Sequence, residues 1–340
     1  MIARATLQKK NREGIRPFDI SRDLNSLANL IEVAFAPELD RTGNTIARDM
    51  RRLASSGPFL WLLDALGACS PSPMRGFVWI AHGQLAGNVT LTLESERRRV
   101  WSISNVAVHP DLQGHGVAQQ LMTAALQEVR TKGARWVVLE VRPDNSPAQK
   151  LYHELGFRAY DQVDELGLAS HRWPVPSSAP FPRLRKRRPD DWEGLYRLCS
   201  SAIPASAQEV HPLHLQQYRL GLGERLQSWL APLIAGRQKD DWVLEEDGEI
   251  VAWLQVTGQY TLVAHRLQMT VHPRHRGRVE SQLVAAGLEH LRRFGQGPVA
   301  STISTAHPEA EQALHSTGFE TIRLLDQMAL GIGINGQAGL

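Results

Sequence analysis

Apolar positions along this chain follow two alternating periods. Short, mostly apolar runs typical of strands are followed by segments whose apolar residues recur at helical spacing. The clearest helical segment begins at Val117, from which Leu121, Ala125 and Val129 fall on one face. The strand-like runs in the first half of the chain are 15–18, 77–81, 84–93, 100–108 and 136–141, with two closing strands expected at 157–162 and 166–171. This succession predicts an α/β fold, of the α+β kind with a mixed sheet.

Local signals complete the first half. His82-Gly83 separates two strand-like runs and predicts a tight hairpin turn. Helices are expected from the first strand to about residue 35 and again at 44–53. The stretch 60–73 has a Pro/Ser-rich end, which is typical of a loop.

The second half of the chain repeats this plan after a proline-rich linker at 173–182. The expected elements are, in order, a strand at 183–188, a helix at 189–202, a helical region at 212–235, a hairpin at 242–256 and a strand at 267–273. The linker divides the chain into two expected domains, 1–175 and 176–340.

Two short motifs recur at a nearly constant offset. Val-His-Pro occurs twice, with His109 and His272 separated by 163 positions. The glycines of L-G-F and T-G-F, Gly156 and Gly318, are separated by 162. A near-constant offset across separate motifs indicates a tandem duplication.

The stretch 106–118, V-A-V-H-P-D-L-Q-G-H-G-V-A, joins an apolar strand to a helix. N–H groups of the loop and of the first helical turn have no partners inside the helix, and the helix dipole adds positive charge there. Gly114 and Gly116 lack a Cβ, so a phosphate can approach the backbone closely. The stretch therefore predicts an anion site, although a plain strand-to-helix turn could carry the same two glycines.

The spacing in this loop separates it from two other phosphate-binding motifs. Gln119 stands where the Rossmann fingerprint needs its third glycine, and no Gly-Lys-Ser/Thr follows as in a P-loop. Gln113, Gly116 and Ala118 instead match the pattern Gln/Arg-x-x-Gly-x-Gly/Ala, preceded by V-x-V-x-P. The stretch resembles the acetyl-CoA pyrophosphate loop of the GNAT superfamily of N-acetyltransferases.

A second block strengthens this resemblance. The run 136–141 is typical of a strand buried on both faces. After Asn145 a helix is expected to start with Ser146 as N-cap and Gln149 completing a capping box. The segment 145–157 is similar to the family signature N-x-x-A-x-x-L-Y-x-x-x-G-F.

The resemblance implies two tandem GNAT-like domains, each a twisted mixed β-sheet flanked by helices, and acetyl-CoA as acyl donor. It implies transfer of an acetyl group to a primary amine of a small molecule or of a peptide N-terminus. Tyr152 is the expected general acid for the leaving thiolate, although its ring would also suit packing between helix and sheet. Asn145 would orient the cofactor or only bond backbone in its loop. The residues implied to bind the cofactor are Val106, Ala107, Val108, Gln113, Gly114, His115, Gly116, Val117, Ala118 and Asn145.

The general base has several candidates. The strand 100–108 carries no carboxylate, so Glu94 or Glu96, near the end of the preceding strand, is a candidate, although both would also suit the role of ordinary surface carboxylates. Glu140 lies on an apolar strand, where an unpaired carboxylate would be costly, and it would serve either in the cleft or in a structural pair. A water chain ending on Ser104 or on backbone is a further alternative.

The second copy departs from these motifs, although Arg276 keeps the Gln/Arg position. A β-branched residue replaces the loop glycine and should crowd the backbone where a phosphate would lie. The substituted residues are Val279, Ser281, His307 and Leu314, which stand at the positions of Gly116, Ala118, Asn145 and Tyr152. This copy is expected to be a scaffold or a substrate-side wall.

Composition narrows the class of protein. The 340 residues are 42% hydrophobic and 21% charged, with a net charge of +3, as expected of a globular protein. No apolar run approaches the ~20 residues that span a bilayer, and 1–16 lacks the apolar core of a secretory signal, so a cytoplasmic protein without membrane contact is expected. Two cysteines are too few for a disulfide framework or a zinc site, and no metal is expected. The basic runs 97–99 and 185–188 lack a nucleic-acid-binding motif and are expected to be solvated surface.

Two other functions fit the same motifs. One is a non-catalytic protein that binds or senses acyl-CoA with the retained loop. The other is a tandem enzyme similar to the mycothiol synthases, although in those the C-terminal copy is the active one. The sequence leaves open the acceptor, the general base, any ligand of the second domain and the formation of a homodimer.

Overall fold

The structure is a computed structural model that describes residues 13–19, parts of 22–34, 75–175 except 96 and 98, 184–219, 237–259 and 264–333. All structural statements below concern these residues. The helix expected at 44–53, the loop at 60–73 and most of the linker lie outside them.

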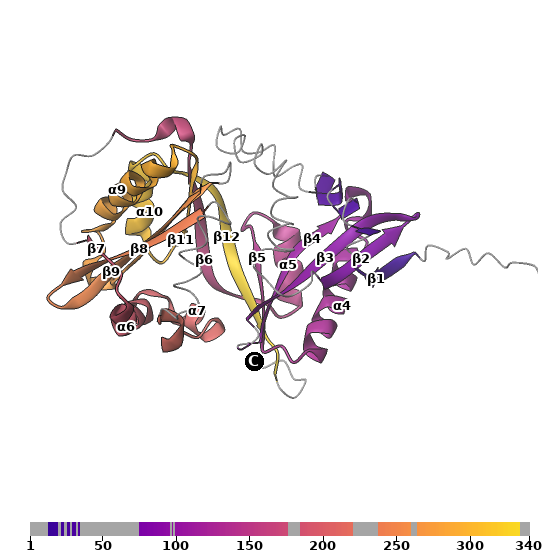
Figure 1. Ribbon diagram of the computed structural model, residues 1–340. Helices are drawn as coiled ribbons and strands as arrows, with labels where there is room; N and C mark the ends of the chain where they lie inside the picture. The colour runs from indigo at the N-terminus through magenta and orange to yellow at the C-terminus, as the bar shows by residue number, and fades with distance from the viewer. Residues whose placement is uncertain are drawn as a thin grey trace, which may run out of the picture.

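The described strands form one continuous twelve-stranded sheet (Figure 1). Its strands are, in spatial order, β1 (Gly14–Pro17), β2 (Arg75–Ala81), β3 (Gln84–Ser95), β4 (Val100–Val108), β5 (Trp136–Val141), β12 (Glu320–Gly331), β6 (Arg158–Leu168), β11 (Val299–Ser304), β10 (His265–Val271), β9 (Glu249–Gln259), β8 (Arg237–Glu246) and β7 (Leu184–Lys186). Parallel pairing of β4 with β5 and of β10 with β11, among antiparallel neighbours, makes the sheet mixed.

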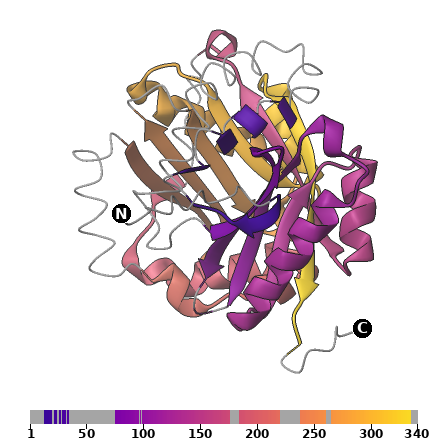
Figure 2. The ribbon, with the colours of Figure 1, turned by 90° about the vertical axis from the view of Figure 1, so that its right-hand side faces the viewer.

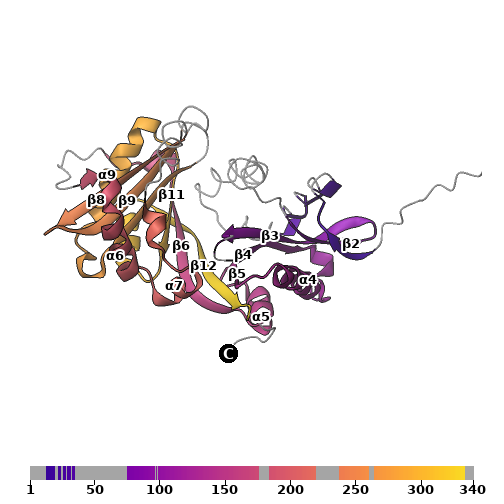
Figure 3. The ribbon, with the colours of Figure 1, turned by 60° about the horizontal axis from the view of Figure 1, so that its bottom comes forward.

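Strands β6 and β12 join the two halves of the sheet. The C-terminal strand β12 lies between β5 and β6, and β6 lies between β12 and β11 (Figure 3). Asp326 on β12 stands opposite Val141 on β5, and Asp164 on β6 stands opposite Ile303 on β11. Asp164 and Asp326 are 162 positions apart, and so are Val141 and Ile303. Residues related by the offset of the sequence repeat therefore occupy equivalent places in the two halves of the sheet. Each half completes its sheet with a strand from the other.

Helices cover both faces of the sheet. On one face of the first half lie α4 (Val117–Thr131) and α5 (Ser146–Glu154), visible as the magenta helices of Figure 2. On the corresponding face of the second half lie α9 (Glu280–Leu291) and α10 (Pro308–Ser316). The opposite face carries α6 (Trp192–Ala202) and α7 (Ala205–Val210).

Each face of the sheet supports its own core. Alternation along the strands sends Leu139 toward α4 and α5, while Val138 faces the other way. Val210 of α7 packs with Val138, so an element from the second half covers the first half's sheet. The described residues include no helix with the length and apolar character needed to cross a bilayer.

Most of the expected elements are confirmed. Strands β4 and β5 have the predicted bounds, and both hairpins turn on two residues with positive φ, 49° and 76° at His82-Gly83 and 50° and 80° at Asp247-Gly248. Short 3-10 helices also occur at Pro110–Leu112, Ser170–Arg172, Pro189–Asp191, Leu215–Tyr218, Pro273–His275 and Arg292–Phe294.

One expectation is wrong. The strands expected at 157–162 and 166–171 are the single strand β6, because β12 and β11 supply hydrogen-bond partners along its length and no turn is needed. Of the region expected to be helical at 212–235, residues 220–235 lie outside the described part of the chain, and 212–219 hold only a 3-10 turn. A six-residue helix, α7, precedes it.

Candidate acetyl-CoA site

Strands β4 and β5 separate at the centre of the first half. They pair in parallel at only three positions, ending at Ser102 opposite Val138. Beyond that point Asn105 adopts φ 51°, and the β3–β4 register shifts, as in a bulge. The buried Asn88 amide holds the bulge by donating to the Asn105 carbonyl at 3.0 Å. The edge of Val106–Val108 that faces β5 therefore has no strand partner among the described residues.

The loop after β4 is organised by its own polar groups. The His109 imidazole accepts a hydrogen bond from the Asp111 N–H at 3.4 Å, and the Gln113 side chain donates to the Val108 carbonyl at 3.2 Å. The His115 ring lies 2.9 Å from the Gln113 carbonyl. These contacts give His109 a structural role.

The glycines of the loop leave open space above the backbone. Gly114 and Gly116 adopt φ 78° and 76°, which favours glycine, and a Cβ at either would meet no atom within 4 Å. Gly116 is the N-cap of α4, and no side chain caps this helix. Gln113 and His115 are exposed, whereas Val117 anchors the first turn in the core. The arrangement presents free N–H groups and a positive helix end to solvent, which suits an anion.

The corresponding loop of the second half has a different geometry. Val279 adopts φ −121° where Gly116 is left-handed. The next residue, Glu280, is 2% exposed, and its carboxylate accepts a hydrogen bond from the Val279 N–H at 3.2 Å and bonds to His307 at 2.8 Å. Burial opposes ionisation of Glu280, but hydrogen bonds from His307 and from backbone N–H groups lower its pKa overall. A carboxylate of the protein thus lies at the N-terminus of α9.

A small cavity adjoins this second loop. Its volume is about 130 Å³, below the roughly 300–1,000 Å³ of typical ligand pockets. The Arg276 guanidinium lines it and donates to the carbonyls of Ala306 and Ala202, at 2.7 and 3.1 Å. This guanidinium is therefore engaged by the protein's own backbone.

Tyr152 lies on α5 inside the core between helix and sheet. It is 6% exposed, and its ring contacts that of Phe157 with centroids 6.1 Å apart. Burial raises the pKa of Tyr152 to about 12, so the phenol stays protonated at neutral pH. The packing that the sequence offered as an alternative is present, and the chemical role stays a prediction.

Asn145 caps α5, so the prediction that Ser146 is the N-cap is wrong. The Asn145 Oδ1 accepts a hydrogen bond from the Ala148 N–H at 3.2 Å, and Ser146 is the first helical residue. Gln149 completes no capping box, because its amide donates to the Asp326 carboxylate at 2.7 Å. The long-range bond to β12 has no local sequence signal.

Tyr152 packs on the face of the sheet that carries α4 and α5, and Glu94 lies on the other face, beside other polar groups. Desolvation raises the pKa of Glu94, a hydrogen bond with Ser102 partly offsets this, and the nearby Glu140 charge raises it further. Glu140 is exposed and accepts a hydrogen bond from the Gln327 amide at 2.9 Å. It is therefore neither buried nor unpaired on its strand.

Two further residues join this polar face. The Tyr160 hydroxyl lies 3.3 Å from Nε2 of His211, and burial together with the charges of Glu94 and Glu140 raises the pKa of Tyr160. Sequence reasoning missed both residues. Tyr160 is on β6 and His211 follows α7, and no motif connects these separated segments with Glu94.

The comparisons with known proteins agree with this geometry. The acetyltransferase (GNAT) family matches residues 44–157, which include the loop, Asn145 and Tyr152. The matched segment lies in the first half of the chain and makes up about a third of its length.

Two relatives illustrate the match. The mycothiol acetyltransferase of Brachybacterium faecium is 34% identical over 147 residues, 43% of this chain and 41% of that protein. The ribosomal protein bS18-alanine N-acetyltransferase of Haemophilus ducreyi is 32% identical over 78 residues, 23% of this chain and 50% of that protein. The chain matches half or less of the length of each.

Solved structures show the fold of the whole chain. A GCN5-related N-acetyltransferase from Sphaerobacter thermophilus has a TM-score of 0.65 at 16% identity, covering 95% of this chain and 98% of that one. A tandem GNAT protein from the clavulanic acid biosynthesis pathway has a TM-score of 0.55 at 18% identity, covering 94% and 98%. The expected tandem GNAT fold is confirmed.

Proposed function

We propose that this chain is an acetyl-CoA-dependent N-acetyltransferase whose first half holds the cofactor. The observation that carries the proposal is the uncapped N-terminus of α4 behind Gly114 and Gly116, next to the separated edge of β4. A helix N-terminus reached through left-handed glycines is suited to a pyrophosphate, and an unpaired strand edge is suited to amides. The first unit in this proposal is 1–175 completed by β12, and the second, 176–340, completed by β6, is the scaffold.

Acetyl-CoA would be bound mainly by backbone groups. The N–H groups of 114–118 would hold the pyrophosphate, whereas the Gln113 N–H already donates to the Pro110 carbonyl. The edge of Val106–Val108 would pair with the pantetheine amides and polarise the thioester carbonyl. Asn145 would act indirectly, since its oxygen already caps α5.

The transfer step needs one base and one hydrogen-bond donor. The amine nitrogen attacks the thioester carbon, the C–S bond breaks, and the amine proton passes to Glu94 directly or through water. The raised pKa makes Glu94 a stronger base than an ordinary carboxylate. Tyr152, with a pKa of about 12, is a weaker acid than a thiol of about 8.5, so it would donate a hydrogen bond to the departing thiolate and solvent would supply the proton.

The acceptor in this proposal is a primary amine of a small molecule or of a peptide N-terminus. The carboxylates of Glu94 and Glu140, whose charges raise the pKa of Tyr160, would attract an ammonium group to this face. The names of the two relatives point to different acceptors, mycothiol chemistry in one and a protein alanine in the other, and both belong in the substrate panel.

The test measures cofactor binding and thiol release together. Replacing Gly116 with Val, the residue at the corresponding position of the second half, should weaken CoA binding at least tenfold, about 1.4 kcal/mol, because φ 76° is strained for a β-branched residue. Gly248→Val is the matched control, since Gly248 has φ 80° and equally open space but lies in a distant hairpin.

Three results would redirect the proposal. Equal CoA affinity in Gly116→Val and in the wild type contradicts the site. CoA binding without thiol release across an amine and peptide panel supports the acyl-CoA sensor instead. Release only with a cysteine-bearing sugar supports the mycothiol-synthase-like alternative.

A further inference from the structure

Asp164 and Asp326 occupy equivalent places in the two halves of the sheet. They lie 162 positions apart, on β6 and β12, and each faces the strand that precedes the half's last helix, α10 or α5. The repeat therefore provides an internal comparison of one carboxylate in two environments.

In the first half the Asp326 carboxylate is fully supplied with amide donors. The Gln149 side chain donates to Oδ2 at 2.7 Å, and the Gln162 side chain donates to Oδ1 at 2.7 Å. Both oxygens have a partner, so this carboxylate needs no cation.

In the second half neither amide is present. Glu311 stands at the position of Gln149, and Leu324 stands at the position of Gln162. Asp164 is only 3% exposed, and Thr321 donates to its Oδ2 at 2.8 Å. Its Oδ1 is buried and receives no hydrogen bond from any described residue. Such an oxygen, beside a second carboxylate, needs a proton or a cation.

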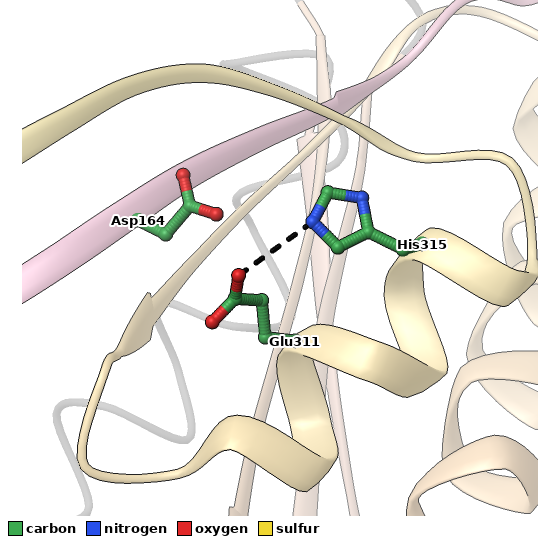
Figure 4. Close-up of side chains that lie close together, drawn as sticks. All are labelled: Asp164, Glu311 and His315. Atoms are coloured by element: carbon green, nitrogen blue, oxygen red, sulfur yellow. Dashed lines mark ion pairs between the residues drawn. The ribbon is translucent and has the colours of Figure 1, made fainter.

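His315 offers a nitrogen lone pair to the same spot. Its Nδ1 lies 3.0 Å from the Phe319 carbonyl, which only accepts, so Nδ1 carries the proton. Its Nε2 lies 3.7 Å from Oε1 of Glu311, one turn earlier on α10. Figure 4 shows the Asp164 carboxylate directed toward these two side chains. In metal-binding histidines, the ring nitrogen that does not bind the metal commonly donates its N–H to a backbone carbonyl, which fixes the orientation of the ring.

We propose that Asp164, Glu311 and His315 bind a divalent transition-metal ion of the Zn²⁺ type. One ligand atom from each lies within 4.8 Å of the others. Ligands at roughly 2.0–2.2 Å from tetrahedral zinc lie about 3.4 Å apart, so the ion would draw the side chains inward. Glu311 and His315 can move because they are 35% and 40% exposed, and their exposure leaves access for the ion and for water ligands.

The ion would connect parts of the chain that are distant in sequence. Asp164 lies on the strand that the first half contributes, and the other two ligands lie on α10 of the second half. Two carboxylates and one imidazole give the mixed O/N set that suits zinc and its neighbours. The expectation of no metal rested on the cysteine count, which carries no information about ligands placed by the fold.

The test is zinc binding to the full-length chain, independent of acetyl transfer. Chelator-treated protein titrated with ZnCl₂ in a calorimeter should bind one ion per chain, and zinc should raise its unfolding temperature. Glu311→Gln, which copies the first half's Gln149, and His315→Gln should each weaken binding at least tenfold. His153→Gln is the matched control, because His153 holds the position of His315 on α5 and should leave zinc affinity unchanged.

Two outcomes would overturn the site. One is no saturable zinc binding by the wild type. The other is the same zinc affinity in Glu311→Gln and His315→Gln as in the wild type, which would place the ion elsewhere. Thermal unfolding of the metal-free variants separates lost affinity from lost folding, and Glu311→Gln is expected to unfold no earlier than the wild type because its amide can donate to Asp164.

Discussion

The loops after β4 and β10 start alike and end differently. Each begins with an imidazole that caps a 3-10 turn by accepting a hydrogen bond. His109 accepts from the Asp111 N–H, and His272 accepts from the Arg274 N–H. Each then passes through a left-handed glycine, with φ 78° at Gly114 and 77° at Gly277. The divergence lies two residues further on, at the helix N-terminus. The two loops therefore share a backbone path up to this glycine and differ only where the following helix begins.

The first loop leaves its helix N-terminus uncapped, whereas the second fills it from within. Glu280 occupies the position of the apolar Val117 and brings a buried carboxylate to the N–H groups of its own helix. The His307 ring then bonds to that carboxylate at 2.8 Å. The difference teaches that two copies of one fold can treat the same helix N-terminus differently: one leaves it open, and the other places a carboxylate of the chain there.

The largest expected effect comes from removing the Tyr152 hydroxyl, which the second half lacks because Leu314 stands at the corresponding position. Tyr152→Phe keeps the ring that packs on Phe157, so a loss belongs to the hydroxyl. Removing a hydrogen-bond donor to the departing thiolate should reduce turnover by about 10²–10³, with CoA affinity little changed. Steady-state rates and CoA titration check this. Turnover within twofold of wild type would assign Tyr152 to packing alone.

The next largest effect is expected from replacing Glu94, which should lower kcat/KM and change its dependence on pH. Counted along the strands from the pairs Gly87–Val108 and Ala252–Val271, Gln259 stands in the corresponding place of the second half. Glu94→Gln should lower kcat/KM by about 10², the lower end for a lost base, since water can still carry the proton.

The pH profile gives the sign of this role. A base must be ionised, so wild-type kcat/KM should fall as pH drops through the pKa of Glu94, which lies above the ordinary value of 4.5. The variant should lack this acidic limb. An unchanged limb in Glu94→Gln would assign the base to another group, such as a water chain.

The buried pair of the second half predicts an effect on stability. His307→Ala leaves the Glu280 carboxylate buried without its side-chain hydrogen-bond partner and should lower the free energy of unfolding by about 3 kcal/mol. Asn145→Ala, at the corresponding position of the first half, removes a helix cap and should cost about 1 kcal/mol. Denaturant unfolding measures both, and equal losses would contradict the difference drawn between the loops.

This stabilisation should also depend on pH. The pKa of Glu280 is lowered in the folded chain, so its contribution is complete above the ordinary value of 4.5 and is lost as pH falls through the lowered value. The loss in wild-type stability over this acidic range should be smaller in His307→Ala.

Sequence patterns predicted the parts of the site that are local. The bounds of β4 and β5 and the start of α4 follow from apolar runs, spacing and glycine positions within a few residues. The tandem plan followed from motifs repeated at a constant offset. These signals act over short distances, where backbone geometry and side-chain periodicity are coupled.

Contacts between distant segments could not be predicted in this way. The placement of β12 between β5 and β6, the approach of His211 to Tyr160, and the meeting of Asp164 with α10 all depend on how the halves pack. The Glu280–His307 pair has the same character, since its members are 27 positions apart and the motif positions that they occupy do not indicate that they meet. Tertiary packing decides such contacts, and one sequence carries no direct record of it.

The smallest expected effect is a null result that sharpens the comparison. Val279→Gly restores the glycine of the first loop to the second, and it should leave CoA binding by that half undetectable. The Glu280 carboxylate would still accept the helix N–H groups, and Arg276 would still bond to Ala306 and Ala202. The measurement is CoA titration in a Gly116→Val background, where the first site is already weakened. Recovery of affinity there would show that the glycine alone decides binding and that the internal carboxylate is no barrier.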